Sequence, residues 1–474
     1  MNRSEYFLAK FTYKSSMRCA IISITKKFRG ATMIKIDFNE SVGKIKPMNG
    51  VNNGPTPPCV RGMSNFDLYK AANIPFARLH DSAFCTYYGW EFSVDVHRIF
   101  RNFDADETIP ASYDFEETDK YLKTITDSGT EVFYRLGTNI EHDKKCGTIP
   151  PKDFNKWARI CEHIIAHYVE GWASGFNYDI RYWEIWNEPD CGGPDGPNPC
   201  WQGTYPQFGE FFCIAAKHLK PRFPSLKIGG PAFAWILAKY EPTGVNPPVE
   251  QILSIMRDRG VKLDFMAYHC YHDTVEFFVE AADTAAAIFD KYGYGDCEIF
   301  LDEWNYVKGW TGDEWIYSMK TIQGKKGASF TAAVMFALQR KSNVDGLMYY
   351  DARPDTNMNG MFDRFFEPLP AYYAISSFGE LLALGDCASS TDDKDVYVCA
   401  AKGENGKEIL VTYYNDDDTS APKSVDFGIK GADGEAEVYY LGDRGFELRE
   451  TIKADKFTLK LNLFDLVKIK INRI

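Results

Sequence analysis

Several features that would place this chain in other protein classes are missing from its sequence. No stretch approaches the roughly 18 to 20 consecutive apolar residues that a membrane-spanning helix requires. The early apolar run at residues 19–24 is too short for the core of a signal peptide, and no small-residue cleavage site follows it. We therefore expect a cytoplasmic protein with no membrane partner.

Excess positive charge and closely spaced cysteines are also missing. The chain has 54 Lys and Arg residues against 66 Asp and Glu, a formal net charge of -12, which argues against nucleic acid as a partner. Its 12 cysteines are scattered without zinc-like spacing, which is typical of reduced thiols, so we expect no metal and no cofactor. Cys191 and Cys200 bracket a Gly/Pro-rich loop and could form a disulfide, although a reducing compartment favours free thiols.

The first 32 residues differ in composition from the rest of the chain. They contain seven Lys and Arg residues and a single acid, Glu5, with little amphipathic order. A basic targeting peptide is one interpretation of residues 1–32, and a poorly ordered extension is the one we favour. In the second case Met33 could be the natural start of the chain.

From about residue 44, strand-like and helix-like segments alternate. Short β-prone runs predict strands at residues 46–51, 76–80, 131–136, 180–186, 226–229, 265–269, 298–301 and 346–350. Amphipathic or apolar segments predict helices at residues 118–127, 152–169, 208–218, 249–258, 277–292, 329–339 and 372–384. Eight strands alternating with helices predict an α/β fold, a (β/α)8 TIM barrel over residues 44–385. A doubly wound open sheet is the alternative, but no Gly-rich phosphate-binding sequence follows the first strand.

The pattern changes after residue 385. Residues 386–474 contain short β-prone runs separated by Asp and Gly turns, which predict a C-terminal β-sandwich. The alternating run at residues 33–38 indicates a further strand that has no place in the barrel. We expect residues 33–43 to join the β-sandwich.

Two glutamates, Glu188 and Glu303, follow the fourth and seventh predicted strands of the barrel. Side chains at the carboxyl ends of barrel strands line the cleft, so both can reach one rim. Retaining hydrolysis of a glycoside needs a carboxylic acid and a carboxylate about 5 to 5.5 Å apart. The pair therefore points to glycoside hydrolysis, although a single Glu at a strand end is more often solvated or salt-bridged.

Residues 186–189, Trp-Asn-Glu-Pro, together with a glutamate at strand seven, resemble glycoside hydrolase clan A and most of all its family 39, which contains β-xylosidases and α-L-iduronidases. The resemblance covers most of the chain after Met33. It implies that Glu188 is the acid/base, Glu303 the nucleophile and Asn187 a donor to the sugar 2-hydroxyl. Residues 302–305, Asp-Glu-Trp-Asn, depart from the Thr-Glu-Phe-Asn type of family 39 and look more like arabinofuranosidases of family 51.

Further polar side chains lie at other strand ends. Arg78 and His80 alternate on strand two and so point the same way, and an Arg near the nucleophile would keep that group ionised. A structural ion pair between Arg78 and Asp81 or another carboxylate of the barrel is the competing interpretation. His269 and Tyr271 on strand six could donate hydrogen bonds to the nucleophile or the sugar. A zinc site that includes His272 is disfavoured, because the odd offset between the two His residues sends them to opposite faces.

Asn53 after strand one and Tyr350 after strand eight could contact substrate hydroxyls, although Tyr350 could equally be a core residue. Trp186 and Trp304 are expected behind the catalytic residues. Three more tryptophans in predicted loops, Trp201, Trp310 and Trp315, could form a platform on which a sugar ring stacks.

We expect a retaining glycosidase that releases non-reducing-end sugars from oligosaccharides by double displacement, most like a β-xylosidase. The same two-Glu mechanism could act on an α-L-arabinofuranoside, β-glucoside or β-galactoside, and a uronic-acid substrate would need a Lys/Arg cluster that the sequence does not identify. A non-catalytic carbohydrate-binding protein on a barrel scaffold is the alternative from another class. The sequence is compatible with a homo-oligomer and leaves the sugar and linkage open.

Overall fold

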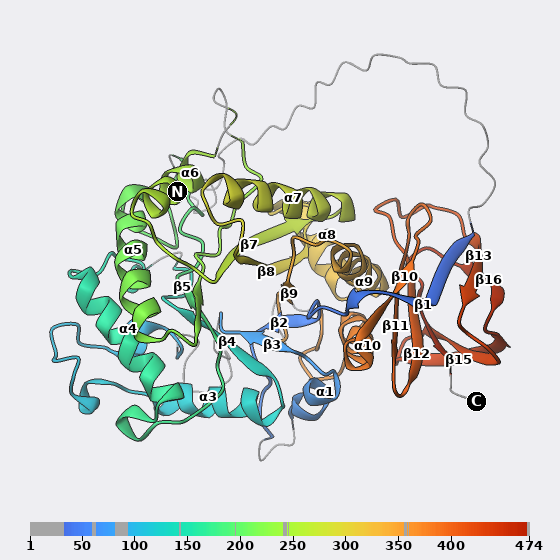
Figure 1. Ribbon diagram of the computed structural model, residues 1–474, viewed down its shortest axis with the longest axis horizontal. Helices are drawn as coiled ribbons and strands as arrows, with labels where there is room; N and C mark the ends of the chain where they lie inside the picture. The colour runs from blue at the N-terminus through green and yellow to red at the C-terminus, as the bar shows by residue number, and fades with distance from the viewer. Residues whose placement is uncertain are drawn as a thin grey trace.

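The computed structural model places a helix-ringed barrel beside a second, predominantly antiparallel sheet (Figure 1). It describes residues 33–58, 63–80, 93–141, 144–194, 196–239, 244, 246–354, 358 and 360–471. The predictions for residues 1–32 and for Asp81 lie outside these described residues.

Eight parallel strands close into a barrel in chain order, which confirms the predicted (β/α)8 fold. They are β2 (Gly50–Asn52), β3 (Phe76–Arg78), β4 (Glu131–Leu136), β5 (Tyr182–Ile185), β6 (Lys227–Gly229), β7 (Phe265–His272), β8 (Glu298–Tyr306) and β9 (Gly346–Tyr349). Each overlaps one of the eight predicted strands. Nearly every residue of these strands is buried, as parallel strands with both faces covered require.

Helices surround the barrel, and several begin at a side-chain cap. The described α-helices are α1 (Phe66–Ala71), α2 (Val96–Ile99), α3 (Glu116–Asp127), α4 (Phe154–Val169), α5 (Tyr205–Arg222), α6 (Pro247–Asp258), α7 (Val275–Lys291), α8 (Gly312–Ile322), α9 (Lys325–Gln339) and α10 (Pro370–Leu384). Asp153, Thr204 and Asn246 accept a backbone N–H at the starts of α4, α5 and α6, which satisfies a donor that the first turn leaves free. The two short helices α1 and α2, and also α8, were not predicted.

The interior of the barrel is layered by the two-residue alternation of its strands. Rings from the first halves of five strands pack with centroids 5.1 to 6.3 Å apart: Phe76, Phe133, Tyr182, Phe265 and Phe300. Two residues further along three of these strands lie Arg78, Glu184 and Asp302, all fully buried. An aromatic layer thus closes the barrel beneath a charged layer, which faces the carboxyl ends of the strands.

The second sheet has nine strands in the order β15-β14-β17-β12-β11-β10-β1-β13-β16. They are β1 (Ile34–Lys44), β10 (Asp386–Ser390), β11 (Val396–Gly403), β12 (Gly406–Tyr413), β13 (Lys423–Lys430), β14 (Glu435–Leu441), β15 (Phe446–Lys453), β16 (Lys456–Leu461) and β17 (Leu466–Ile471). β1 pairs antiparallel with β10 and parallel with β13, so the first described strand lies inside the C-terminal sheet. The sheet curls around its own apolar core, to which strands from both ends contribute.

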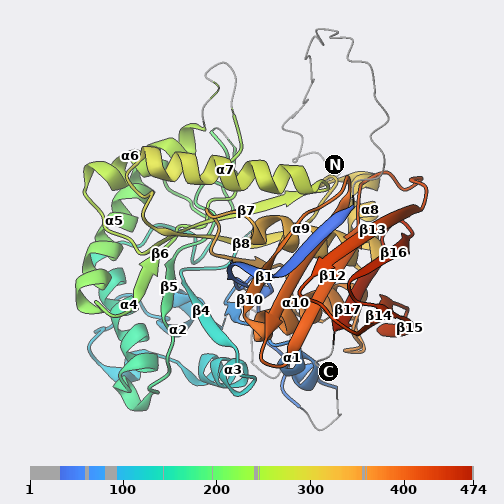
Figure 2. The ribbon, with the colours of Figure 1, turned by 45° about the vertical axis from the view of Figure 1, so that its right-hand side comes forward.

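The outer face of this sheet is joined to the barrel. Cys399, Ala401 and Leu410 of β11 and β12 belong to the same apolar core as the barrel helices, and Figure 2 shows α9 and α10 between the barrel and these strands. Within the described segments, no helix combines the length and the apolar character that a membrane span requires.

Candidate active site

Glu188 lies directly after β5, where the backbone turns sharply. Trp186 and Glu188 both have positive φ angles, 75° and 46°, a region that side chains other than glycine rarely adopt and that is concentrated at functional sites. The Trp186 ring is buried, contacts the ring of Trp201 at 5.2 Å, and donates its indole N–H to the Cys200 carbonyl at 3.0 Å. The Glu188 amide donates to the Ala232 carbonyl at 3.0 Å. These contacts hold the turn and therefore fix the direction of the Glu188 carboxylate.

Glu303 lies within β8, at an irregularity of the strand register. Tyr268 of β7 pairs with Leu301, whereas the next residue, His269, pairs with Glu303. Asp302 is therefore the extra residue of a β-bulge, a device that redirects side chains. Because of this bulge, the neighbours Asp302 and Glu303 both face the barrel interior and both contact Arg78.

The two glutamates approach each other across His269. His269 Nδ1 lies 2.8 Å from Glu188 Oε1 and 3.7 Å from Glu303 Oε2. A carboxylate oxygen of Glu188 and one of Glu303 lie within 4.8 Å of each other. Retaining glycosidases hold their carboxyl groups about 5 to 5.5 Å apart, whereas inverting ones need about 6.5 to 9.5 Å to admit a water. The spacing therefore suits direct attack by one carboxylate.

Donors and cations surround Glu303, which is 6% exposed. The Tyr271 hydroxyl donates to Oε1 at 2.6 Å, while Arg78 Nη1 and His80 Nε2 lie 3.2 and 3.4 Å from Oε2. Hydrogen bonds and positive charge stabilise the ionised form of a carboxyl group. Glu188 lies in a different environment, because burial raises its pKa above the usual value while His80 and Arg78 lower it in part. Glu303 thus lies among hydrogen-bond donors, whereas the surroundings of Glu188 bias it toward its acid form.

Arg78 organises the layer below the glutamates. Its guanidinium, fully buried, lies 2.8 Å from Glu184, 3.1 Å from Asp302 and 3.2 Å from Glu303, and it donates to Asn187 Oδ1 at 2.6 Å. One cation thus faces three carboxyl groups. Burial, followed by the charge of Glu184, raises the pKa of Asp302 well above its usual value.

His269 is neutral, because burial lowers its pKa to about 3. Its contact with Glu188 is therefore a hydrogen bond and not an ion pair. Asn187, 1% exposed, gives its oxygen to Arg78, and its Nδ2 has no hydrogen-bond partner among the described residues. A buried amide donor without a partner is costly, so this group is well suited to meet a substrate hydroxyl.

Asn53 and Tyr350 lie at the rim with different contacts. Asn53 is fully buried and donates its side-chain amide to Asp351 Oδ2 at 3.4 Å. Tyr350 is half-buried and packs edge-on against His80, with ring centroids 5.3 Å apart. The structure therefore places Tyr350 beside His80 and ties Asn53 to Asp351, in the loop that follows β9.

The structure agrees with some of the tryptophan predictions and contradicts others. Trp186 and Trp304 are buried behind the glutamates, as predicted. The prediction for Trp201 is wrong, since it is fully buried and packs on Trp186 and not on the open rim. Trp310 is 47% exposed, its ring lies 5.2 Å from that of Tyr271, and Trp315 stacks on it at 5.8 Å from within α8 and not from a loop.

Sequence reasoning did not single out Glu184 or Asp302, which together with Asn52, Glu303 and Asn187 complete the contacts of Arg78. The sequence does contain a sign of this cluster, because Glu184 is a charged residue among the apolar residues of β5, as Arg78 is in β3. Charged residues at fully buried strand positions need partners of opposite sign. That rule could have joined Arg78 to Glu184.

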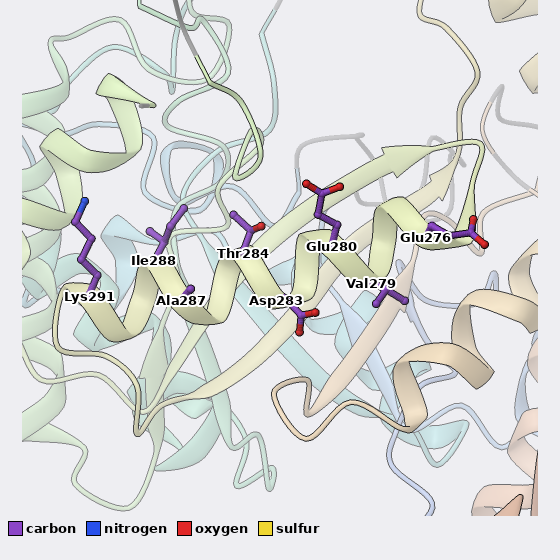
Figure 3. Close-up of a pocket in the computed structure, with 8 residues that line it drawn as sticks. All are labelled: Glu276, Val279, Glu280, Asp283, Thr284, Ala287, Ile288 and Lys291. Carbon is purple, nitrogen blue, oxygen red and sulfur yellow. The ribbon is translucent and has the colours of Figure 1, made fainter. Parts of the chain in front are cut away.

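Ligating atoms gather at two places among the described residues. One is Glu188, His269 and Glu303, and the other is Glu188, Cys191 and Cys200, whose thiols are free. A depression on the surface lies elsewhere, because all eight residues that line it belong to the outer face of α7 (Figure 3). It is remote from the carboxylates that end β5 and β8.

The chain is similar to known proteins in sequence and in fold. The model of glycosyl hydrolases family 39 matches residues 32–290, more than half of the 474-residue chain. A β-xylosidase of Caldicellulosiruptor saccharolyticus is 24% identical over 202 residues, which cover 40% of this chain and 37% of the relative. A β-xylosidase of Geobacillus stearothermophilus is 26% identical over 184 residues, covering 36% and 33%. The matches thus span little more than a third of these curated relatives.

Solved structures resemble nearly the whole chain in fold. A glucosidase from Croceicoccus marinus has a TM-score of 0.74 at 22% identity, covering 93% of this chain and 98% of that one. The GH39 enzyme from Xanthomonas axonopodis pv. citri has a TM-score of 0.67 at 15% identity, with coverages of 96% and 100%. The GH51 α-L-arabinofuranosidase from Thermotoga petrophila RKU-1 has a TM-score of 0.64 at 15% identity, with coverages of 93% and 100%.

Proposed function

This chain belongs to glycosyl hydrolases family 39, and from that premise we propose that it is a retaining exo-β-xylosidase acting on short oligosaccharides. The observation that carries the proposal is the pair Glu188 and Glu303, whose nearest oxygens lie within 4.8 Å at one barrel rim. The two β-xylosidase relatives support the choice of sugar. An α-L-arabinofuranosidase is the second candidate, because residues 302–305 read Asp-Glu-Trp-Asn.

The first chemical step joins the sugar to the protein. Glu188, biased toward its acid form by burial, protonates the oxygen of the scissile bond. The Glu303 carboxylate attacks the anomeric carbon, the glycosidic bond breaks, and the leaving group departs as an alcohol. Tyr271 and Arg78 contact the Glu303 carboxyl group and orient it for this attack.

The second step returns the protein to its starting state. Bonding to the sugar removes the negative charge of Glu303, so the pKa of Glu188 falls and its carboxylate can accept a proton. Glu188 then takes a proton from water, the resulting hydroxide attacks the anomeric carbon, and the bond to Glu303 breaks. Two displacements give net retention of configuration.

Two groups would orient the substrate. The Nδ2 amide of Asn187, buried beside Arg78, can donate to a sugar hydroxyl next to the reacting carbon. Trp310 presents an exposed ring next to Tyr271 and is backed by Trp315, an arrangement suited to the face of a sugar in the leaving group.

Substitution of the nucleophile tests the proposal. Glu303→Ala should lower kcat/KM on an aryl β-xyloside by more than about a thousandfold. The nucleophile and the acid act together, so the loss of either one removes most of the rate acceleration. Glu298→Ala, at the other end of β8, is the matched control and should stay within a few-fold of wild type. Activity of Glu303→Ala within tenfold of the parent would overturn the assignment. A panel of aryl glycosides decides between the two sugars.

A further inference from the structure

Glu188 has a second set of neighbours besides the acid and base groups of the cleft. While its Oε1 faces His269, its Oε2 lies 3.9 Å from the sulfur of Cys200. The Cys191 and Cys200 sulfurs and a Glu188 oxygen all lie within 4.8 Å of one another. Two thiols and a carboxyl group therefore converge on one point at the edge of the site.

The loop that carries these thiols is held at both ends by hydrogen bonds. Asn198 donates its side-chain amide to the Pro189 carbonyl at 2.6 Å and accepts the Cys200 amide at 2.8 Å. Asp190, 1% exposed, accepts the backbone N–H groups of Ala234 and Trp235 at 2.8 and 3.0 Å. The two sulfurs are thus brought together by their backbone supports and not by a covalent bond, since both thiols are free.

We propose that Cys191, Cys200 and Glu188 bind a thiophilic divalent cation such as Zn²⁺, and that the bound cation inhibits the glycosidase. Zinc binds thiolate sulfur at about 2.3 Å and carboxylate oxygen at about 2.0 to 2.2 Å, so ligand atoms around a tetrahedral ion lie roughly 3.3 to 3.8 Å apart. Small side-chain rotations bring the three atoms from their present spacing to that geometry. Binding displaces one proton from each thiol and the proton from the acid form of Glu188, and water fills the fourth position.

The three ligands in their ionised forms carry charge that suits a divalent cation. Two thiolates and one carboxylate together carry three negative charges, which more than balance the two positive charges of the ion. Cys200 is 2% exposed, whereas Cys191 is only partly buried and gives the ion a route from solvent.

Inhibition follows from the identity of the third ligand, and this part of the inference rests on the proposed function. A Glu188 oxygen bound to a cation cannot carry the proton that the leaving group needs. Substrate turnover should therefore fall as the site fills. Metal binding itself requires no activity, so it can be measured separately.

The test is a titration of the reduced protein, kept in a phosphine reductant, with Cd²⁺ and Zn²⁺. We expect one Cd²⁺ per chain and the ultraviolet charge-transfer band of two cadmium–thiolate bonds. Cys191→Ser and Cys200→Ser should each weaken Cd²⁺ binding at least about tenfold, since even losing a partner behind a metal ligand costs that much. Cys146→Ser, which changes an exposed thiol outside the cluster, is the control and should bind as wild type does.

Zn²⁺ should inhibit hydrolysis of an aryl xyloside by wild type and by Cys146→Ser, and a chelator should restore both rates. Cys191→Ser and Cys200→Ser, each compared with its own metal-free rate, should need at least tenfold more Zn²⁺ for the same inhibition. Absence of the thiolate band in wild type, or equal affinity in all variants, would overturn the site. If a Ser variant does not fold, Glu188→Gln replaces it and should also bind Cd²⁺ at least about tenfold more weakly. A protein that binds Cd²⁺ as expected but hydrolyses no glycoside would support the site and refute the proposed function.

Discussion

Replacing Arg78 by methionine removes the one cation that faces three buried carboxyl groups. The guanidinium is fully buried and lies 2.8 Å from Glu184, 3.1 Å from Asp302 and 3.2 Å from Glu303. Removing one partner of a buried ion pair costs about 3 to 5 kcal/mol, because the remaining charge stays desolvated and unpaired. We expect Arg78→Met to lower the free energy of unfolding by about that amount at pH 7.

The assay is urea unfolding followed by tryptophan fluorescence, since Trp183 and Trp304 are buried in the barrel. Arg181→Met is the matched control, because Arg181 pairs with Glu131 at 2.5 Å at a half-exposed position, and such surface pairs contribute about 0 to 1 kcal/mol. Adding Glu184→Gln to Arg78→Met should recover part of the lost stability, because one unpaired carboxyl is neutralised.

Equal destabilisation by the Arg78 and Arg181 variants would refute this reasoning about the buried charges. Activity gives a second readout of the Arg78 variant. Loss of a preorganised group beside the nucleophile should lower kcat/KM at least about a hundredfold, whereas Arg181→Met should leave it near the wild-type value.

Two further predictions concern the groups around the glutamates. The proposed mechanism uses the acid form of Glu188, whose pKa burial raises, so kcat/KM should fall as pH rises through that pKa. Glu188→Gln should abolish this basic limb of the pH–rate profile, and persistence of the limb would assign it to another group. Tyr271→Phe removes the 2.6 Å hydrogen bond to Glu303 and should lower kcat about 10- to 100-fold with little change in KM. A change in KM alone would show that Tyr271 acts on substrate binding.

The barrel could be predicted from the sequence because its strands are buried on both faces and so appear as continuous apolar runs between helical patterns. β4 was predicted at its observed bounds, residues 131–136. α8 was not predicted, although it is amphipathic; its large apolar residue Ile316 is exposed and Trp315 is only partly buried.

The two glutamates could be placed at one rim from strand counting, but their surroundings could not. Strict alternation from Phe300 sends Asp302 inward and Glu303 outward, and only the β-bulge brings both to Arg78. A bulge depends on register with the neighbouring strand, which one strand's sequence does not specify. The burial of Trp201 could not be predicted either, because it depends on how the loop after Glu188 folds back and packs that ring on Trp186.

The central claim, that Glu303 forms a covalent bond with the sugar, is tested most directly by trapping. An activated 2-fluoro xyloside slows the second step, so the glycosyl-enzyme accumulates and can be located by mass spectrometry of peptides. We predict one fluoroxylosyl group per chain on Glu303 in wild type and none in Glu303→Ala. Turnover without a trapped intermediate, or label on another residue of the wild-type protein, would contradict the account.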